Sequence, residues 1–161
     1  LRTYGEEKFA TRIVESIVKE REKAPLNSTS HLATLVKNAI PAATRRTGGN
    51  PAKRTFQALR IETNDELGAI TRAIPQALDL LDLHARLVVM SFQSLEDRIV
   101  KNFFQEATTS GTPQGLPVEI AELAAKFTLV FNGSQSPTDK EVEENSRAAS
   151  VRLRAIERVA A

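Results

Sequence analysis

Three residues at the junction of a predicted strand and a predicted helix are candidates for ligand contact: Phe92, Gln93 and Ser94. The run RLVVMS before them is short and continuously apolar, which is typical of a strand buried on both faces of a parallel sheet. The run after them has helical spacing, and Ser94 with Asp97 has the spacing of a capping box. Residues just past the carboxyl end of a strand in an open α/β sheet lie where such sheets bind ligands.

The chemistry of this junction would suit a nucleobase. A ring such as Phe92 can stack on a flat base, and an amide such as Gln93 can hydrogen-bond a base edge. The alternative is structural: Phe92 packs, Gln93 faces water and Ser94 only caps the helix. For Ser94 the capping role is the simpler interpretation, whereas for Phe92 and Gln93 both interpretations stay open.

A second candidate site is a basic cluster around two adjacent glycines in the stretch TRRTGGNPAKRTFQALR. A loop followed by a helix start can hold phosphates through side-chain charge and free helix-terminal N–H groups. A solvated surface is the alternative for any single residue, but the cluster as a whole favours RNA or phosphate contact. Its members are Arg45, Arg46, Lys53, Arg54 and Arg60.

Composition limits the remaining possibilities. Of 161 residues, 41% are hydrophobic and 26% are charged, so a packed core is expected. The net charge of +2 does not by itself argue for nucleic acid. The absence of Cys excludes disulfides and thiolate metal sites, and two His argue against a His-rich metal site. No apolar run approaches the roughly 18 residues of a membrane span. The chain begins without Met and inside an element, so we expect that its natural start is missing.

Apolar periodicity divides the chain into two parts. Residues 1–63 are predicted to be all-helical and residues 64–161 to be α/β, with three strands. The predicted helices cover 6–23, 28–40, 51–62, 64–81 and 94–107, and the predicted strands cover 86–91, 126–131 and 150–159.

Four stretches, in this order and at these intervals, resemble one family: LRTYGEEKFATRIVESIV, NPAKRTFQALRIETNDEL, RLVVMSFQSLEDRIVKNFF and SRAASVRLRAIERV. This is the bacterial ribosomal-RNA small-subunit methyltransferase H family, also called MraW. The resemblance covers nearly the whole chain. It implies a cytoplasmic enzyme that transfers a methyl group from S-adenosylmethionine to the exocyclic N4 of a cytidine in 16S rRNA, with no membrane or metal partner. It leaves the oligomeric state open, a homodimer included.

The family also implies an organisation. Its Rossmann-like methyltransferase domain is interrupted by a helical, substrate-recognising insertion. Residues 1–63 would be the last part of that insertion, and residues 64–161 would be the carboxyl-terminal half of the methyltransferase sheet. The family's cofactor contacts precede the stretch that matches Leu1, so no cofactor residue is assigned, and the fragment alone is expected neither to bind S-adenosylmethionine properly nor to methylate.

Several positions depart from the family pattern. Asn50 and Gln93 stand where the family usually has His, LHA at 83–85 replaces Pro-Gly-Gly, and Ser146 replaces the Pro that usually follows Asn145. Gln can hydrogen-bond but cannot titrate, so the change at position 93 bears on any acid–base role there. A non-catalytic RNA- or ribosome-binding module is therefore the alternative to the enzyme.

Overall fold

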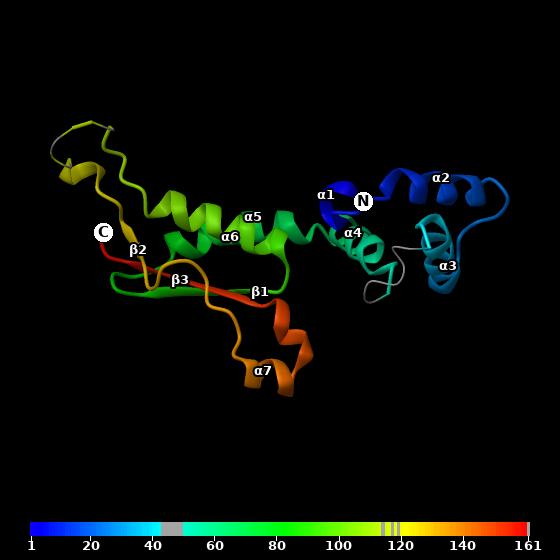
Figure 1. Cartoon of the computed structure of the whole chain (residues 1–161). Coiled ribbons are helices and arrows are strands. Elements are labelled where there is room, and N and C mark those ends of the chain that lie inside the picture. The colour runs from blue at the N-terminus through cyan, green and yellow to red at the C-terminus, as the bar shows by residue number, and fades with distance from the viewer. Residues whose placement is uncertain (43–49, 114, 117, 119, 161) are drawn as a thin grey trace. The chain divides into compact units, whose positions relative to one another are not determined.

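The computed structural model describes residues 1–42, 50–113, 115, 116, 118 and 120–160. These residues form helices and a small sheet, which confirms the predicted mixed α/β class (Figure 1). The chain divides into two compact units, Leu1–Glu66 and Leu67–Ala161.

The first unit is helical in its described part. A buried cluster at its centre, Ile13, Val36, Ala39, Ile40 and Ala52, joins α2, α3 and the start of α4. Ser28 caps α3 by accepting the His31 N–H. The helices are α1 (Arg2–Gly5), α2 (Ala10–Arg21), α3 (Thr29–Ala39) and α4 (Lys53–Asn64).

Gly5 allows α1 and α4 to pack closely. A Cβ atom on Gly5 would lie 2.7 Å from the backbone oxygen of Arg54 and 3.3 Å from the Cβ of Ala58. The next helix does not begin at Thr63 or Asn64, as predicted. Instead α4 runs through Asn64, and Asp65, in the left-handed conformation with φ 49°, separates it from α5.

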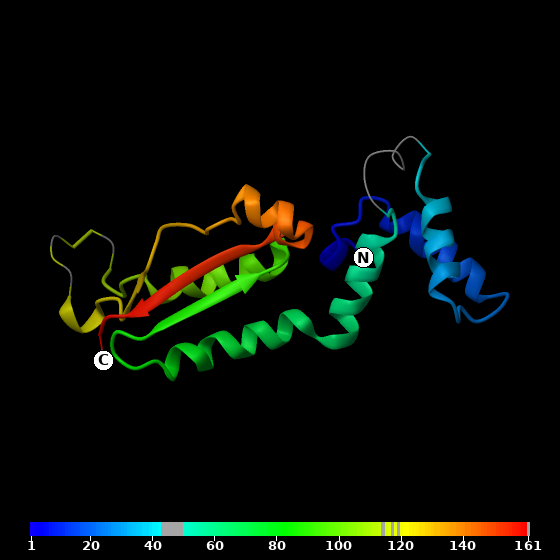
Figure 2. The ribbon, with the colours of Figure 1, turned by 90° about the horizontal axis from the view of Figure 1, so that it is seen from below.

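The second unit contains a three-stranded sheet in the order β1-β3-β2, and β3 is antiparallel to both neighbours. Figure 2 shows β1 and β3 side by side and running in opposite directions. The strands are β1 (Arg86–Ser91), β2 (Phe127–Leu129) and β3 (Arg152–Arg158). The helices are α5 (Glu66–Asp79), α6 (Ser94–Ala107) and α7 (Asp139–Glu144), with short 3₁₀ helices η2 (Ala121–Leu123) and η3 (Ser146–Ser150).

The two faces of this sheet differ. On the face that we call the covered face, Leu87 and Ile156 pack against the apolar sides of α5 and α6, around the buried ring of Phe104. On the opposite, open face, the side chains of Val88 and Met90 are 55% and 53% exposed.

The predicted parallel strand buried on both faces is therefore wrong for the described residues. β1 pairs antiparallel with β3, because the last strand of the chain returns between β1 and β2. The run RLVVMS is continuously apolar, yet its burial alternates along the strand. Leu87 and Val89 belong to the core, and Val88 and Met90 do not.

Candidate functional site

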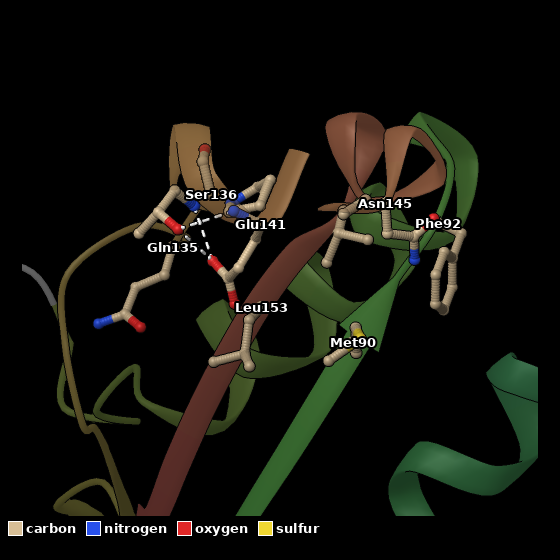
Figure 3. Close-up of a pocket in the computed structure, with 11 residues that line it drawn as sticks. Met90, Phe92, Gln135, Ser136, Glu141, Asn145 and Leu153 are labelled. Carbon is tan, nitrogen blue, oxygen red and sulfur yellow. Dashed lines mark hydrogen bonds between the residues drawn. The ribbon is translucent and has the colours of Figure 1, made fainter. Parts of the chain in front are cut away.

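A cavity of about 390 Å³ lies at the carboxyl end of β1, between the open face of the sheet and the α7–η3 segment (Figure 3). We call it the strand-end pocket. It is lined by Met90, Phe92, Gln135, Ser136, Pro137, Thr138, Glu141, Asn145, Ala148, Val151 and Leu153. It lies entirely within the second unit.

The floor of the strand-end pocket is apolar. Met90 and Leu153 are register partners on β1 and β3, so their side chains lie on the same face of the sheet. Phe92 follows the end of β1, and this residue is 56% exposed. An exposed aromatic ring beside an apolar floor can stack on a planar ligand.

The α7–η3 segment supplies the polar lining. The Glu141 carboxylate accepts hydrogen bonds from the backbone N–H of Thr138 at 2.7 Å and from its hydroxyl at 2.9 Å. These donors hold the pKa of Glu141 below its ordinary value, so the side chain is ionised and engaged at neutral pH. Asn145 begins η3, and its Oδ1 accepts the Arg147 N–H at 3.1 Å.

The turn between β1 and α6 is held by Glu96. Its carboxylate accepts the N–H of Phe92 at 2.8 Å and that of Gln93 at 3.2 Å, and it also accepts the Gln93 side-chain amide at 3.1 Å. The cap of α6 is thus Gln93 with Glu96, and the predicted capping box of Ser94 with Asp97 is wrong. The reason is that α6 begins at Ser94 itself, so the capping position falls one residue earlier, at Gln93.

The three predicted junction residues therefore have different surroundings. Phe92 lines the strand-end pocket. Gln93 uses its amide in the helix cap, and Ser94 is the first, exposed residue of α6. The backbone that carries the Phe92 ring is fixed by Glu96, which makes Glu96 a positioning residue for this ring.

A salt bridge joins α6 to the sheet. Arg154 donates to both carboxylate oxygens of Asp97, at 2.7 Å from Nε and 3.0 Å from Nη2. The side chains are only 14% and 19% exposed. The hydrogen bond from Arg154 lowers the pKa of Asp97, and the positive charges of Arg154 and Arg152 lower it further.

The predicted basic cluster is described only in part, since Arg45 and Arg46 lie outside the described residues. Lys53 is exposed at the first position of α4. Arg54 donates to the backbone oxygen of Glu6 at 3.0 Å. Arg60 is held by both carboxylate oxygens of Glu66, at 2.7 and 3.1 Å, so a carboxylate already offsets its charge.

The sequence alone did not point to the α7–η3 segment, which forms the far wall of the strand-end pocket. The spacing of Thr138 and Glu141 could have revealed the start of α7, since it is a capping box. No helix among the described residues has the length and apolarity needed to cross a membrane. Within the same ranges, no group of three or more His, Asp or Glu side chains is placed to hold a metal ion.

The family model described as the MraW methylase family matches residues 1–159. The chain belongs to this family. The resemblance found in the four sequence stretches is thereby confirmed.

Curated relatives agree with this assignment. Proteins named ribosomal RNA small subunit methyltransferase H are 52% identical in Corynebacterium glutamicum (strain R) over 160 residues and 55% identical in Corynebacterium diphtheriae over 157 residues. The matches cover 99% and 98% of this chain but 48% and 46% of the relatives. A third relative, from Saccharopolyspora erythraea, is 55% identical over 159 residues, with 48% of its length covered. The chain thus spans about half the length of the curated relatives it matches.

Proposed function

We propose that this chain is the substrate-facing part of an S-adenosylmethionine-dependent methyltransferase that modifies the exocyclic N4 of a cytosine in 16S rRNA. Family membership supports methyl transfer to small-subunit rRNA. The observation that carries the chain's own role is the strand-end pocket, which places the exposed ring of Phe92 at the carboxyl end of β1. A flipped-out base stacked on such a ring would be held for attack on a methyl donor.

The sheet fits a larger Rossmann-like sheet of which residues 64–161 are the carboxyl-terminal half. β1 and β2 are both antiparallel to β3 and hence parallel to each other, with α6 in the connection between them. Mixed sheets with an antiparallel strand are common in doubly wound folds. The other edge of β1 pairs with no strand among the described residues, so further parallel strands could join there. On this proposal, residues 1–63 are the end of the helical insertion.

The described residues do not fit the methyl donor itself. Nucleotide sites in α/β folds use a Gly-rich turn after a strand and a free carboxylate for the ribose hydroxyls. Here the turn after β1 is Phe92–Gln93, and the carboxylate lining the pocket, that of Glu141, already accepts two hydrogen bonds from Thr138. We therefore place the contacts to S-adenosylmethionine in the part of the family's length that this chain does not span.

Contact with rRNA is the second element of the proposal. Lys53 and Arg54, with Arg45, Arg46 and Arg60, would hold backbone phosphates on the first unit. Replacing both Lys53 and Arg54 with Ala should weaken RNA binding and reduce the slope of log K against log salt by about 1–2, because each lost phosphate contact removes close to one counterion. Lys37→Ala, an exposed lysine on α3, is the matched control. An unchanged affinity and salt slope in the double variant would refute this patch.

The activity can be tested in a chimera. The matching segment of the Corynebacterium glutamicum relative is replaced by this chain, and the product is incubated with unmethylated small subunits and isotopically labelled S-adenosylmethionine. The proposal expects N4-methylcytidine in the digested 16S rRNA, detected by mass spectrometry. The unmodified relative is the positive control.

One observation favours the second candidate, a non-catalytic RNA- or ribosome-binding module. Gln93 stands at the position of the family's usual His, and its side-chain NH2 donates to Glu96 in the helix cap. A carboxamide is not basic, so Gln93 cannot accept a proton from the reacting amine. A chimera that binds small subunits as tightly as the relative but transfers no methyl group would establish the module and end the enzyme proposal. Either role belongs in the bacterial cytoplasm, where ribosomes are assembled.

A further inference from the structure

We infer that Asn145 reads the acceptor edge of the pyrimidine held in the strand-end pocket and so selects cytosine over uracil. This inference rests on the proposed function, which supplies the base. It adds a specificity-determining residue that neither the sequence pattern nor the comparisons assign. Asn145 lies between α7 and η3 and lines the strand-end pocket, where Figure 3 shows it beside Phe92.

The orientation of the Asn145 amide is fixed by its role as a cap. Its Oδ1 accepts the backbone N–H of Arg147 at 3.1 Å at the start of η3. The oxygen is thereby identified, and the other atom of the amide, Nδ2, is left with two N–H donors and no acceptor. No hydrogen bond from Nδ2 is found within the described residues. Figure 3 shows this nitrogen turned toward Phe92 and Met90.

Two other polar residues of the pocket, Glu141 and Gln135, offer Asn145 no competing contact. Glu141 is bound by Thr138, as described above. The backbone N–H and C=O of Gln135 pair with Leu153 at 2.9 and 3.0 Å, and Figure 3 shows the Gln135 amide directed away from Asn145. A base lying against Phe92 would therefore meet a hydrogen-bond donor at Asn145.

A hydrogen-bond donor at Asn145 can distinguish cytosine from uracil. Cytosine carries two adjacent acceptors, O2 and N3, and its N4 amine is a donor. Uracil also carries O2, but its N3 bears a hydrogen, which would oppose the N–H of Asn145. Contact through O2 and N3 leaves the exocyclic N4 of cytosine out of the contact with Asn145, so the amine stays accessible to a methyl donor. Two hydrogen-bond donors that face each other cost more binding free energy than the loss of one hydrogen bond. The single amide of Asn145 can therefore discriminate between cytosine and uracil.

The test uses this chain with two short oligoribonucleotides that differ only in a central C or U within an adenosine context. Affinities are measured by fluorescence anisotropy, and the Asn145 side-chain amide is followed by ¹H–¹⁵N NMR. The wild-type chain should prefer the C-containing RNA by about tenfold, the equivalent of about 1.4 kcal/mol. The NMR signal of the Asn145 amide should shift with the C-containing RNA and not with the other.

The decisive variant is Asn145→Asp. Aspartate keeps the oxygen that caps η3, so the fold and the melting temperature should not change. It replaces the donor with an acceptor, so the preference for C should disappear or invert. Asn132→Asp introduces the same charge at an exposed position outside the pocket and should lower both affinities equally while keeping the C-to-U ratio.

The outcomes separate this inference from the proposed function. RNA binding with no preference for C in the wild-type chain, or an unchanged ratio in Asn145→Asp, overturns the role of Asn145 and leaves RNA binding intact. If the wild-type chain binds neither RNA, the proposed rRNA contact fails and this inference fails with it. A preference that is lost in Asn145→Asp and kept in Asn132→Asp supports it.

Discussion

The two faces of the sheet in the second unit are built from the same strands and differ in what covers them. On the covered face, Ile156 and Phe104 are 0% and 1% exposed beneath α5 and α6. On the open face, Val88 and Met90 are more than half exposed, and the strand-end pocket lies at one end. Along one strand, alternate residues therefore either build the core or remain open to a ligand.

The difference has an energetic consequence. Apolar side chains contribute to stability roughly in proportion to the area that they remove from water, at about 25 cal/mol per Å². Substitutions on the covered face should therefore change the free energy of unfolding. Substitutions on the open face should change ligand contact instead, with little effect on unfolding.

The largest expected effect is that of Phe104→Ala on the covered face. A buried Phe replaced by Ala typically costs about 3–5 kcal/mol, a large part of a domain's total stability. We expect the urea midpoint of the second unit, followed through the NMR signals of β1, to fall sharply. Phe92→Ala makes the same chemical change at an exposed ring and should cost less than about 1 kcal/mol. Similar losses in the two variants would abolish the contrast between the faces.

An intermediate effect is expected for the salt bridge between Asp97 on α6 and Arg154 on β3. Asp97→Asn removes the charge that pairs with Arg154 and keeps the shape of the side chain. Hydrogen bonds to charged groups contribute about 1.5–3 kcal/mol, and both side chains are less than a third exposed, so a loss of about 1–3 kcal/mol is expected at pH 7. Lys140, an exposed partner of Glu144 at 3.9 Å, provides the control, because Lys140→Met should cost almost nothing.

The pH dependence of the same pair has a definite sign. Arg154 lowers the pKa of Asp97 in the folded state, so the unfolded state binds a proton at higher pH than the folded state does. The stabilisation is complete above the ordinary aspartate pKa of about 3.9 and is lost as the pH falls through the lower, folded value. The difference in unfolding free energy between wild type and Asp97→Asn should therefore be constant near neutrality and shrink below about pH 4. A difference that stays constant down to pH 2 would contradict this assignment.

The sequence was sufficient where local chemistry determines structure. The positions of most helices and of the three strands followed from spacing alone. It was insufficient where residues distant along the chain decide the outcome. RLVVMS is apolar at every central position, so only the return of β3 beside it determines the direction of pairing, and only the position of α5 and α6 determines which alternate residues are buried.

The same distinction applies to the site. Phe92 was proposed from a strand-to-helix junction, which is a local signal, and the structure places this residue in the lining of the strand-end pocket. Nothing in the sequence indicated that Asn145 lines the same cavity, because it reaches the cavity through the pairing of β1 with β3, which joins residues such as Ser91 and Arg152 that are distant along the chain. For Gln93 the sequence left contact with a base and exposure to water both open, yet Glu96, one turn along the helix, offers its amide a local partner.

The smallest expected effect tests the two faces within one strand. Val88 and Val89 are adjacent, and their side chains lie on opposite faces of β1. Threonine has nearly the same shape as valine and suits a strand, so Val88→Thr should change the unfolding free energy by no more than about 0.5 kcal/mol. Val89→Thr places a hydroxyl against the covered-face cluster and should cost about 1 kcal/mol or more. Urea denaturation of both variants measures the difference directly. If Val88→Thr proves the more destabilising, the open face is packed in solution against something other than water, and the contrast between the two faces does not hold.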